Sequence, residues 1–198
     1  MKIGVLSLQG AFIEHIHIFE KLGVMAVEVR SPETLATLDG LVIPGGESTS
    51  MLNLAHSYGL IEPLREFAAS GRPMMGTCAG MILLAKEVAD SDMRTLRLMD
   101  IGVRRNAFGR QVDSFETDLT IPVIGGDKFH AVFIRSPFIE KVGEGVEILA
   151  RLEDGTVVAA RQESMLALAF HPELGQDTRL HRYFIDMVTE ASPMSLRA

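Results

Sequence analysis

The sequence predicts an α/β fold in which helices cover both faces of a mostly parallel open sheet, with antiparallel strands added in the C-terminal half. Three observations support this prediction. Short apolar runs alternate with amphipathic helical segments up to about residue 98, in the rhythm of a parallel sheet. Beyond that point strand-like runs succeed one another with hardly any helix between them, which is typical of antiparallel pairing. The 198 residues contain no repeat, low-complexity tract or linker, so we expect one domain over residues 1–198.

Strands and helices alternate in the first half of the chain. Residues 2–8 form an apolar run of the kind that a buried parallel strand shows. Phe12, Ile16 and Phe19 follow with the spacing of an amphipathic helix. The further elements expected here are strands at 25–29 and 41–43, a helix through residue 54 capped within Ser48, Thr49 and Ser50, a helix at 63–69 and a strand at 73–76.

The second half predicts mainly strands. Runs at 112–121, 129–134, 146–152 and 157–160 are separated by turns such as 153–155. A last apolar strand is expected at 167–170, after which Asp177 or Thr178 can cap a final helix. The apolar face of that helix carries Leu180, Tyr183, Phe184, Met187 and Val188.

The composition argues against several classes of function. A net charge of −7 is unsuited to a nucleic-acid surface, because neutralising phosphates requires a dense basic face. No apolar run approaches the roughly 20 residues that cross a bilayer, and no signal peptide precedes the first strand, so we expect no membrane partner. The single cysteine rules out an intramolecular disulfide and suits a reducing compartment. We therefore expect a cytoplasmic globular protein.

That cysteine, Cys78, lies between Gly76 and Gly80 where an expected strand becomes an expected helix. This G-x-C-x-G pattern is the cysteine form of a nucleophile elbow. Such a turn projects the side chain above the C-terminal edge of the sheet, and it needs glycines because neighbouring backbone approaches closely. The helix starting at Ala79 supplies free N–H groups that favour a thiolate, and the Ala79 N–H can help to hold an oxyanion. A lone cysteine is more often a buried core residue, so the pattern needs partners.

A base for Cys78 is found late in the chain, in Phe170-His171-Pro172-Glu173. Imidazole is the usual base near neutral pH, and a carboxylate two residues on can orient the ring and stabilise its cation. His171 follows the expected strand at 167–170, so in a parallel arrangement it reaches the same sheet edge as Cys78. A surface histidine before a loop is the commoner alternative.

The loop Pro44-Gly45-Gly46-Glu47-Ser48 follows the strand at 41–43 and reaches the same edge. Its glycine pair lets backbone N–H groups form a cradle for an anion or oxyanion. It is not a Walker A loop, because no Gly-Lys-Ser/Thr follows. Alone it would be an ordinary turn, but three such elements at one edge predict a site.

Together these three motifs resemble the class I, or triad, glutamine amidotransferases, which implies their flavodoxin-like fold. Blocks across nearly the whole chain narrow the resemblance to the glutaminase subunits of pyridoxal 5′-phosphate synthases. The blocks are GVLSLQGAFIEH at 4–15, LVIPGGEST at 41–49, GTCAGMILLAKE at 76–87, RRNAFGRQVDSFE at 104–116, VFIRSP at 132–137 and FHPEL at 170–174. The first and fourth blocks point to this subunit, whereas the triad motifs mark only the superfamily.

The resemblance implies hydrolysis of L-glutamine to glutamate and ammonia through a glutamyl thioester. Cys78 would attack the side-chain amide, His171 would protonate the leaving ammonia and then act as base, and Glu173 would hold the ring. The N–H groups of Gly46 and Ala79 would form the oxyanion hole.

The resemblance also implies a glutamine pocket lined by Gly46, Glu47, Ser48, Arg105, Ile134 and Arg135. An arginine suits the α-carboxylate of glutamine. The choice is open among Arg104, Arg105, Arg110 and Arg135, which all lie near the matched blocks.

The family further implies a partner, a separate (β/α)₈-barrel synthase subunit that receives the ammonia and builds pyridoxal 5′-phosphate from a pentose phosphate and a triose phosphate. Glutaminase activity would depend on docking to that subunit. Gln9 and Gly10 follow the first strand at the predicted site edge. We expect them to contact the partner and to couple docking to formation of the oxyanion hole.

We predict no metal site and no cofactor. His15 and His17 are two residues apart and diverge on a helix, and His56, His130 and His181 have no neighbours at ligand spacing.

Three alternatives differ in chemistry or partner. The first is a glutaminase subunit that serves a different synthase, such as the one that forms imidazole glycerol phosphate. The second is a related cysteine peptidase or hydrolase, which usually carries histidine directly after the cysteine, where this chain has Ala79. The third is a binding module that has lost the chemistry, which intact Cys78, His171 and Glu173 argue against.

Overall fold

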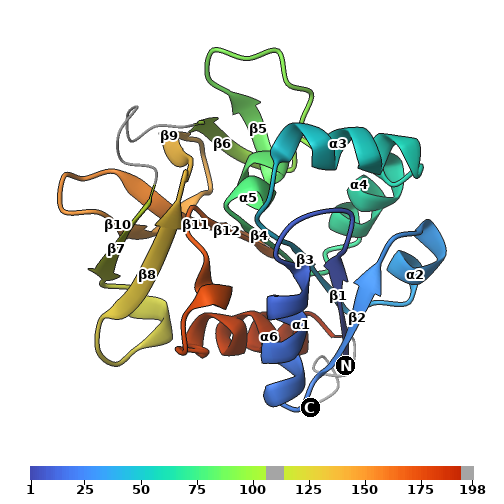
Figure 1. Ribbon diagram of the computed structural model, residues 1–198, viewed down its shortest axis with the longest axis horizontal. Coiled ribbons are helices and arrows are strands. Elements are labelled where there is room, and N and C mark those ends of the chain that lie inside the picture. The colour runs from blue at the N-terminus through green and yellow to red at the C-terminus, as the bar shows by residue number, and fades with distance from the viewer. Residues whose placement is uncertain (106–113, 193–198) are drawn as a thin grey trace.

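The computed structural model describes residues 1–105 and 114–192 (Figure 1). The strands are β1 (Lys2–Leu6), β2 (Met25–Val29), β3 (Gly40–Ile43), β4 (Met74–Thr77), β5 (Ala85–Val88), β6 (Met99–Arg104), β7 (Ser114–Leu119), β8 (Phe129–Ile134), β9 (Phe138–Val142), β10 (Glu147–Arg151), β11 (Val157–Gln162) and β12 (Met165–Leu168). The α-helices are α1 (Phe12–Lys21), α2 (Pro32–Ala36), α3 (Ser48–Ser57), α4 (Ile61–Ala69), α5 (Ala79–Leu84) and α6 (Arg179–Ala191), and two short 3₁₀ helices are η1 (Pro122–Ile124) and η2 (Pro172–Leu174).

Ten of the described strands form one sheet in the order β2-β1-β3-β4-β12-β11-β9-β6-β5, and β10 pairs with β11 beside this path. The segment from β2 to β12 is parallel throughout. β11 then pairs antiparallel with β12, β10 and β9. β7 and β8 form a separate antiparallel ribbon. The predicted α/β class, with antiparallel additions in the second half, is confirmed.

Helices cover both faces of the parallel strands (Figure 1). α1 and α6 lie side by side on one face, where the rings of Phe19 and Phe184 are 6.2 Å apart. α5 packs on the opposite face against β3 and β4, with α3 next to it. The side chains that meet in these layers are fully buried, and removal of their apolar surface from water holds the helices to the sheet.

The apolar pattern does not predict β5, β6 and β9. Their exposed positions carry ion pairs, Lys86 with Asp100 and Lys141 with Glu87, each at 2.7 Å. These charges interrupt the apolar run by which a strand is recognised, and pairing with neighbouring strands places the segments in the sheet.

The last strand of the sheet begins and ends two residues earlier than the expected 167–170. Ala169 and Phe170 are fully buried although they follow the strand, and the Ala169 N–H still donates to Val158 O at 2.8 Å. Burial beyond the strand end therefore explains the misplaced boundary. Of the expected strand at 112–121, residues 112 and 113 lie outside the described residues.

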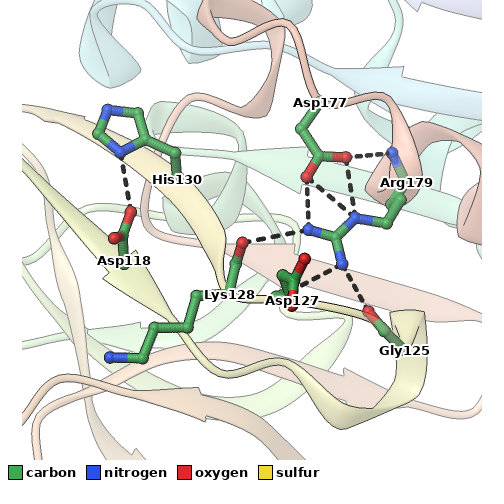
Figure 2. Close-up of polar contacts among 7 residues, drawn as sticks. All are labelled: Asp118, Gly125, Asp127, Lys128, His130, Asp177 and Arg179. Atoms are coloured by element: carbon green, nitrogen blue, oxygen red, sulfur yellow. Dashed lines mark hydrogen bonds and ion pairs between the residues drawn. The ribbon is translucent and has the colours of Figure 1, made fainter.

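The start of α6 is held by side chains rather than by its N-cap residue. Thr178 occupies the N-cap position without a side-chain hydrogen bond, and Asp177 instead accepts from the Arg179 N–H at 3.0 Å. Figure 2 shows the Arg179 guanidinium donating to the Asp177 carboxylate and to the carbonyls of Gly125, Asp127 and Lys128. These bonds tie the turn before β8 to α6, on the side of the molecule where β8 contacts η2. Within the described residues, each helix is too short or too polar to cross a membrane.

Candidate active site

Cys78 occupies a strained turn between β4 and α5. Its backbone angles are φ 48° and ψ −105°, a region that residues other than glycine rarely adopt. The Cys78 N–H donates to Leu168 O at 2.8 Å, which anchors the turn to the neighbouring strand. A Cβ on Gly76 would lie 2.6 Å from the Gly80 carbonyl group, and a Cβ on Gly80 would meet Ile43 O. The two glycines therefore permit the close approach that the elbow was predicted to need.

His171 reaches the same sheet edge because β12 runs parallel to β4, with Leu168 opposite Thr77. Its backbone N–H donates to Val132 O at 2.9 Å, and its Nδ1 lies 2.6 Å from Glu173 Oε1. Burial alone would lower the pKa of His171, but hydrogen bonds and charge interactions with Cys78 and Glu173 outweigh burial and raise it to about 10. The imidazole is therefore a cation near neutral pH, beside both the thiol and the carboxylate.

The loop after β3 completes this edge. A Cβ on Gly45 would meet His171 Cε1, and it would lie 2.9 Å from His171 Nδ1 and 3.4 Å from Cys78 Cβ, so only glycine fits beside the pair. The loop is bonded to the segment before α1, because the Ala11 N–H donates to Gly45 O at 3.1 Å. Gln9 Oε1 accepts from the Glu47 N–H at 2.7 Å, which places Gln9 against the predicted oxyanion loop.

The N-cap of α3 is Glu47, and the prediction of a cap within Ser48, Thr49 and Ser50 was wrong. The longer glutamate side chain reaches forward to accept from the N–H groups of Thr49, at 3.0 Å, and Ser50, at 2.7 Å. Hydrogen bonds from Ser50 and then Thr49 lower the pKa of Glu47 to about 2. Glu47 thus uses its side chain to cap the helix while it lines the pocket.

One pocket of about 410 Å³ opens beside Cys78. It is large enough for a single amino acid. Its lining comprises Gln9, Gly46, Glu47, Ser48, Cys78, Ala79, Ile82, Arg105, Ile134, Arg135, Pro137 and His171. Ten of the twelve residues predicted for the site are in this lining. The other two, Glu173 and Gly10, lie behind it: Glu173 beside His171, and Gly10 in contact with the Gly45–Gly46 backbone.

The arginines near the matched blocks separate into groups. Arg105 and Arg135 line the pocket, and Arg135 has a positive φ of 44° at the end of β8. Arg104 instead pairs with Asp90 and Glu140, away from the pocket. Arg110 lies outside the described residues. Two of the four candidates for the glutamine carboxylate are therefore in place.

Sequence reasoning missed His15. Its side chain is fully buried, and its Nε2 lies 3.3 Å from Glu173 Oε2. The available signal was its position on the buried face of α1, three residues after Phe12 and four before Phe19. In residues 1–105 and 114–192 no group of three or more histidine, cysteine or acidic side chains is placed to hold a metal ion.

The chain is similar to glutamine amidotransferases over nearly its full length. The model of the SNO glutamine amidotransferase family matches residues 5–190. The pyridoxal 5′-phosphate synthase subunit PdxT of Dehalococcoides mccartyi is 57% identical over 195 residues, which cover 98% of this chain and 100% of the relative. The subunit of the same name from Geobacillus kaustophilus is 56% identical over 195 residues, with 98% of each chain covered.

Solved structures agree with this relationship. A crystal structure described as a glutamine amidotransferase has a TM-score of 0.89 and 48% identity, covering 94% of this chain and 98% of its own. The structure of PurLQS from Thermotoga maritima has a TM-score of 0.68 at 15% identity, covers 96% of both chains, and shares the fold alone. The family match and the identities above settle membership: this chain belongs to the SNO glutamine amidotransferase family.

Proposed function

We propose that this protein hydrolyses L-glutamine to glutamate and ammonia, and supplies the ammonia to a partner synthase subunit for pyridoxal 5′-phosphate (vitamin B6) synthesis. Membership of the glutamine amidotransferase family and relatives named as subunits of that synthase support the pathway. The observation that supports the chemistry is the contact of His171 with Cys78 on one side and Glu173 on the other, at the edge of the pocket. The whole chain, residues 1–198, would act as one glutaminase domain in the cytoplasm.

The first half of the reaction uses His171 as an acid. The Cys78 thiolate attacks the side-chain carbonyl carbon of glutamine, and the carbonyl oxygen becomes an oxyanion held by the N–H groups of Gly46 and Ala79. The His171 imidazolium gives its proton to the departing nitrogen, so ammonia leaves and a glutamyl thioester remains. The pKa near 10 keeps that proton on His171 at neutral pH until the leaving group needs it.

The second half uses the same ring as a base. Once the thioester has formed, the thiolate is gone, and its contribution to the raised pKa of His171 is lost with it. Neutral His171 takes a proton from water, the hydroxide adds to the thioester, and collapse of the adduct releases glutamate and restores the thiolate. Glu173 holds the ring through both steps by its bond to Nδ1.

The pocket suits the ends of free glutamine. Its Arg105 and Arg135 are the cations for the α-carboxylate, whereas the backbone of Gly46, Glu47 and Ser48 and the Ile134 side chain line the remainder. Arg105 Nη2 lies 3.8 Å from Glu47 Oε1, so no close ion pair has to break when Arg105 binds a substrate carboxylate. Gln9 and Gly10 would contact the partner, a (β/α)₈ barrel.

The test is ammonia release from L-glutamine by the protein alone and with a barrel synthase subunit added, beside a Cys78→Ala variant. Turnover that rises sharply with the partner and is absent from the variant is the expected result. Strong turnover without a partner would support Cys78 as the nucleophile but would refute the dependence of activity on docking. Absence of turnover under both conditions, with Cys78 unreactive towards a glutamine-mimicking electrophile, would overturn the proposal in favour of a binding module.

A further inference from the structure

The second carboxylate oxygen of Glu173 faces away from the pocket. While Oε1 is bonded to His171, Oε2 points to His15 Nε2 at 3.3 Å, and both side chains are fully shielded from solvent. Oε2 forms no hydrogen bond with the described residues as they stand, and His15 Nε2 approaches it without completing one. A buried carboxylate oxygen that lacks a hydrogen-bond donor is costly in free energy. His15 is the group in position to be that donor.

His15 is itself held from three elements. It belongs to α1, its Nδ1 lies 3.0 Å from His181 Nε2 on α6, and its Nε2 lies 3.4 Å from Thr77 Oγ1 at the end of β4. The His181 ring also packs edge-on against Phe19, at 5.2 Å between centroids. These contacts hold the His15 ring with Nε2 close to two acceptors, Thr77 Oγ1 and the Glu173 carboxylate.

Both of these histidines are neutral near pH 7. Burial, followed by the charges of His181 and His171, holds the pKa of His15 well below its usual value. Burial lowers the pKa of His181 to about 4. A neutral imidazole has one N–H, so the hydrogen-bond pattern decides which nitrogen of each ring carries it.

The pattern selects one arrangement of protons. With the proton of His15 on Nε2, that N–H has Thr77 Oγ1 and Glu173 Oε2 as acceptors within reach, and Nδ1 accepts from the Nε2–H of His181. His181 Nδ1 is then a bare acceptor, and it is the one atom of the two rings without a partner among the described residues. The opposite arrangement would bury an unpaired N–H on His181 and turn the lone pair of His15 towards the carboxylate, at a greater cost in free energy.

We propose that His15 is a positioning residue for the reaction: its Nε2–H holds Oε2 of Glu173 and thereby keeps the carboxylate aimed at His171. This inference rests on the proposed glutaminase function. His15 does not line the pocket, so it acts through Glu173 and not on the substrate. The titratable groups that adjoin Glu173 lie on two sides: Cys78 and His171 on the side of the pocket, and His15 and His181 on the opposite side.

The experiment compares two substitutions in the full-length protein assayed with its barrel partner. His15→Gln keeps an N–H donor at about the distance of Nε2 from the backbone, whereas His15→Leu has a similar size and no donor. We expect His15→Leu to lower kcat by roughly tenfold with KM unchanged, as loss of one hydrogen bond to a charged group implies. The acid limb of the pH profile of kcat/KM should move to higher pH, because Glu173 protonates more readily without the donor. His15→Gln should restore most of both quantities. His17→Leu, an exposed neighbour on α1, is the matched control and should match the wild type.

Two outcomes would overturn the proposal. The first is a folded His15→Leu protein with the kcat and pH profile of the wild type. The second is an equal loss of kcat in His15→Leu and His15→Gln with the acid limb of the pH profile unmoved, because a role in packing alone would give that result. Should His15→Leu fail to fold, the nitrogen-15 NMR spectrum of wild-type His15 decides. A neutral ring protonated on Nε2 supports the proposal, and a proton on Nδ1 or a cationic ring contradicts it. This spectrum does not depend on turnover, so a wild type that releases no ammonia would refute the glutaminase function separately.

Discussion

The side-chain oxygen of Gln9 lies 2.7 Å from the amide nitrogen of Glu47, so the segment that leads into α1 is bonded to the loop that carries Gly46. A Cβ on Gly10 would also meet Gly45 O, and Gly10 has a positive φ of 94° that glycine tolerates. Movement of residues 9–11 would therefore move the predicted oxyanion hole. This contact gives a physical route by which a docked partner can alter the pocket.

Replacing Gln9 with leucine should lower partner-stimulated ammonia release by roughly tenfold, because the loop at Gly46 loses the bond that positions its N–H groups. The measurement is kcat at saturating partner and glutamine. Gln162→Leu is the control, since Gln162 Oε1 likewise accepts from a backbone N–H, that of Asp100 at 2.7 Å, and Gln162 does not line the pocket. Unchanged stimulation in the Gln9 variant would refute the coupling role.

Gly45→Ala should abolish most of the turnover without unfolding the protein. The added methyl would occupy the space of the His171 ring, which must then rotate away from Cys78. We expect a loss of at least about a hundredfold in kcat/KM, in the range seen when a general acid–base is displaced. Gly175→Ala is the matched control, because its Cβ would approach no described atom closer than 3.9 Å. Wild-type activity in Gly45→Ala would show that the ring has another place to lie.

The pKa of His171 can be followed by NMR titration of its ring from about pH 6 to about pH 11. In the wild type the ring should lose its proton near pH 10, and in Cys78→Ala the titration should move to lower pH, since one source of the raised pKa is gone. The His171 interactions stabilise the fold below its ordinary pKa near 6.5 and cease to do so as the pH rises through about 10. His130, whose pKa is raised by Asp118 and Glu116 on the surface, is an internal control that should not move. A His171 titration near pH 6.5 in both proteins would contradict the stabilisation of the His171 cation by Cys78 and Glu173.

Glu47→Gln should reduce the free energy of unfolding by about 1 kcal/mol or less at pH 7, because the helix cap loses its charge. The effect is small because half of the Glu47 side chain is exposed, so solvent screens the charge. Since the pKa of Glu47 is lowered, its contribution is present above the ordinary value near 4.5 and is lost as the pH falls through about 2. Urea denaturation at several pH values should therefore show the difference between wild type and variant vanishing on acidification. Glu66→Gln, which removes a charge at an exposed position of α4, is the matched control. A difference that persists unchanged to about pH 2 would exclude the cap charge as its cause.

Local sequence patterns were sufficient to predict the fold class and the residues expected at the site edge. Parallel strands end at the same edge of a sheet, so Cys78 after β4, His171 after β12 and the glycine loop after β3 had to meet once those strands were parallel. That reasoning needs only local apolar runs and the residues that follow them. It failed at β5, β6 and β9, where charges on exposed strand faces conceal the pattern.

The residues behind that edge could not be predicted from local patterns, because they meet through the packing of helices. His15 was set aside because it and His17 diverge on a helix, and His181 because it has no neighbour at ligand spacing. Packing of α1 against α6 nevertheless brings His15 Nδ1 within 3.0 Å of His181 Nε2 and places His15 against Glu173. The structure also revealed the Glu47 cap, and it separated Arg104, which pairs with Asp90 and Glu140, from the predicted Arg105 and Arg135, which line the pocket. These contacts join segments far apart in the chain, or depend on the reach of one side chain. They are determined by how the layers pack, because most buried polar groups pair with whichever partner the fold brings near them.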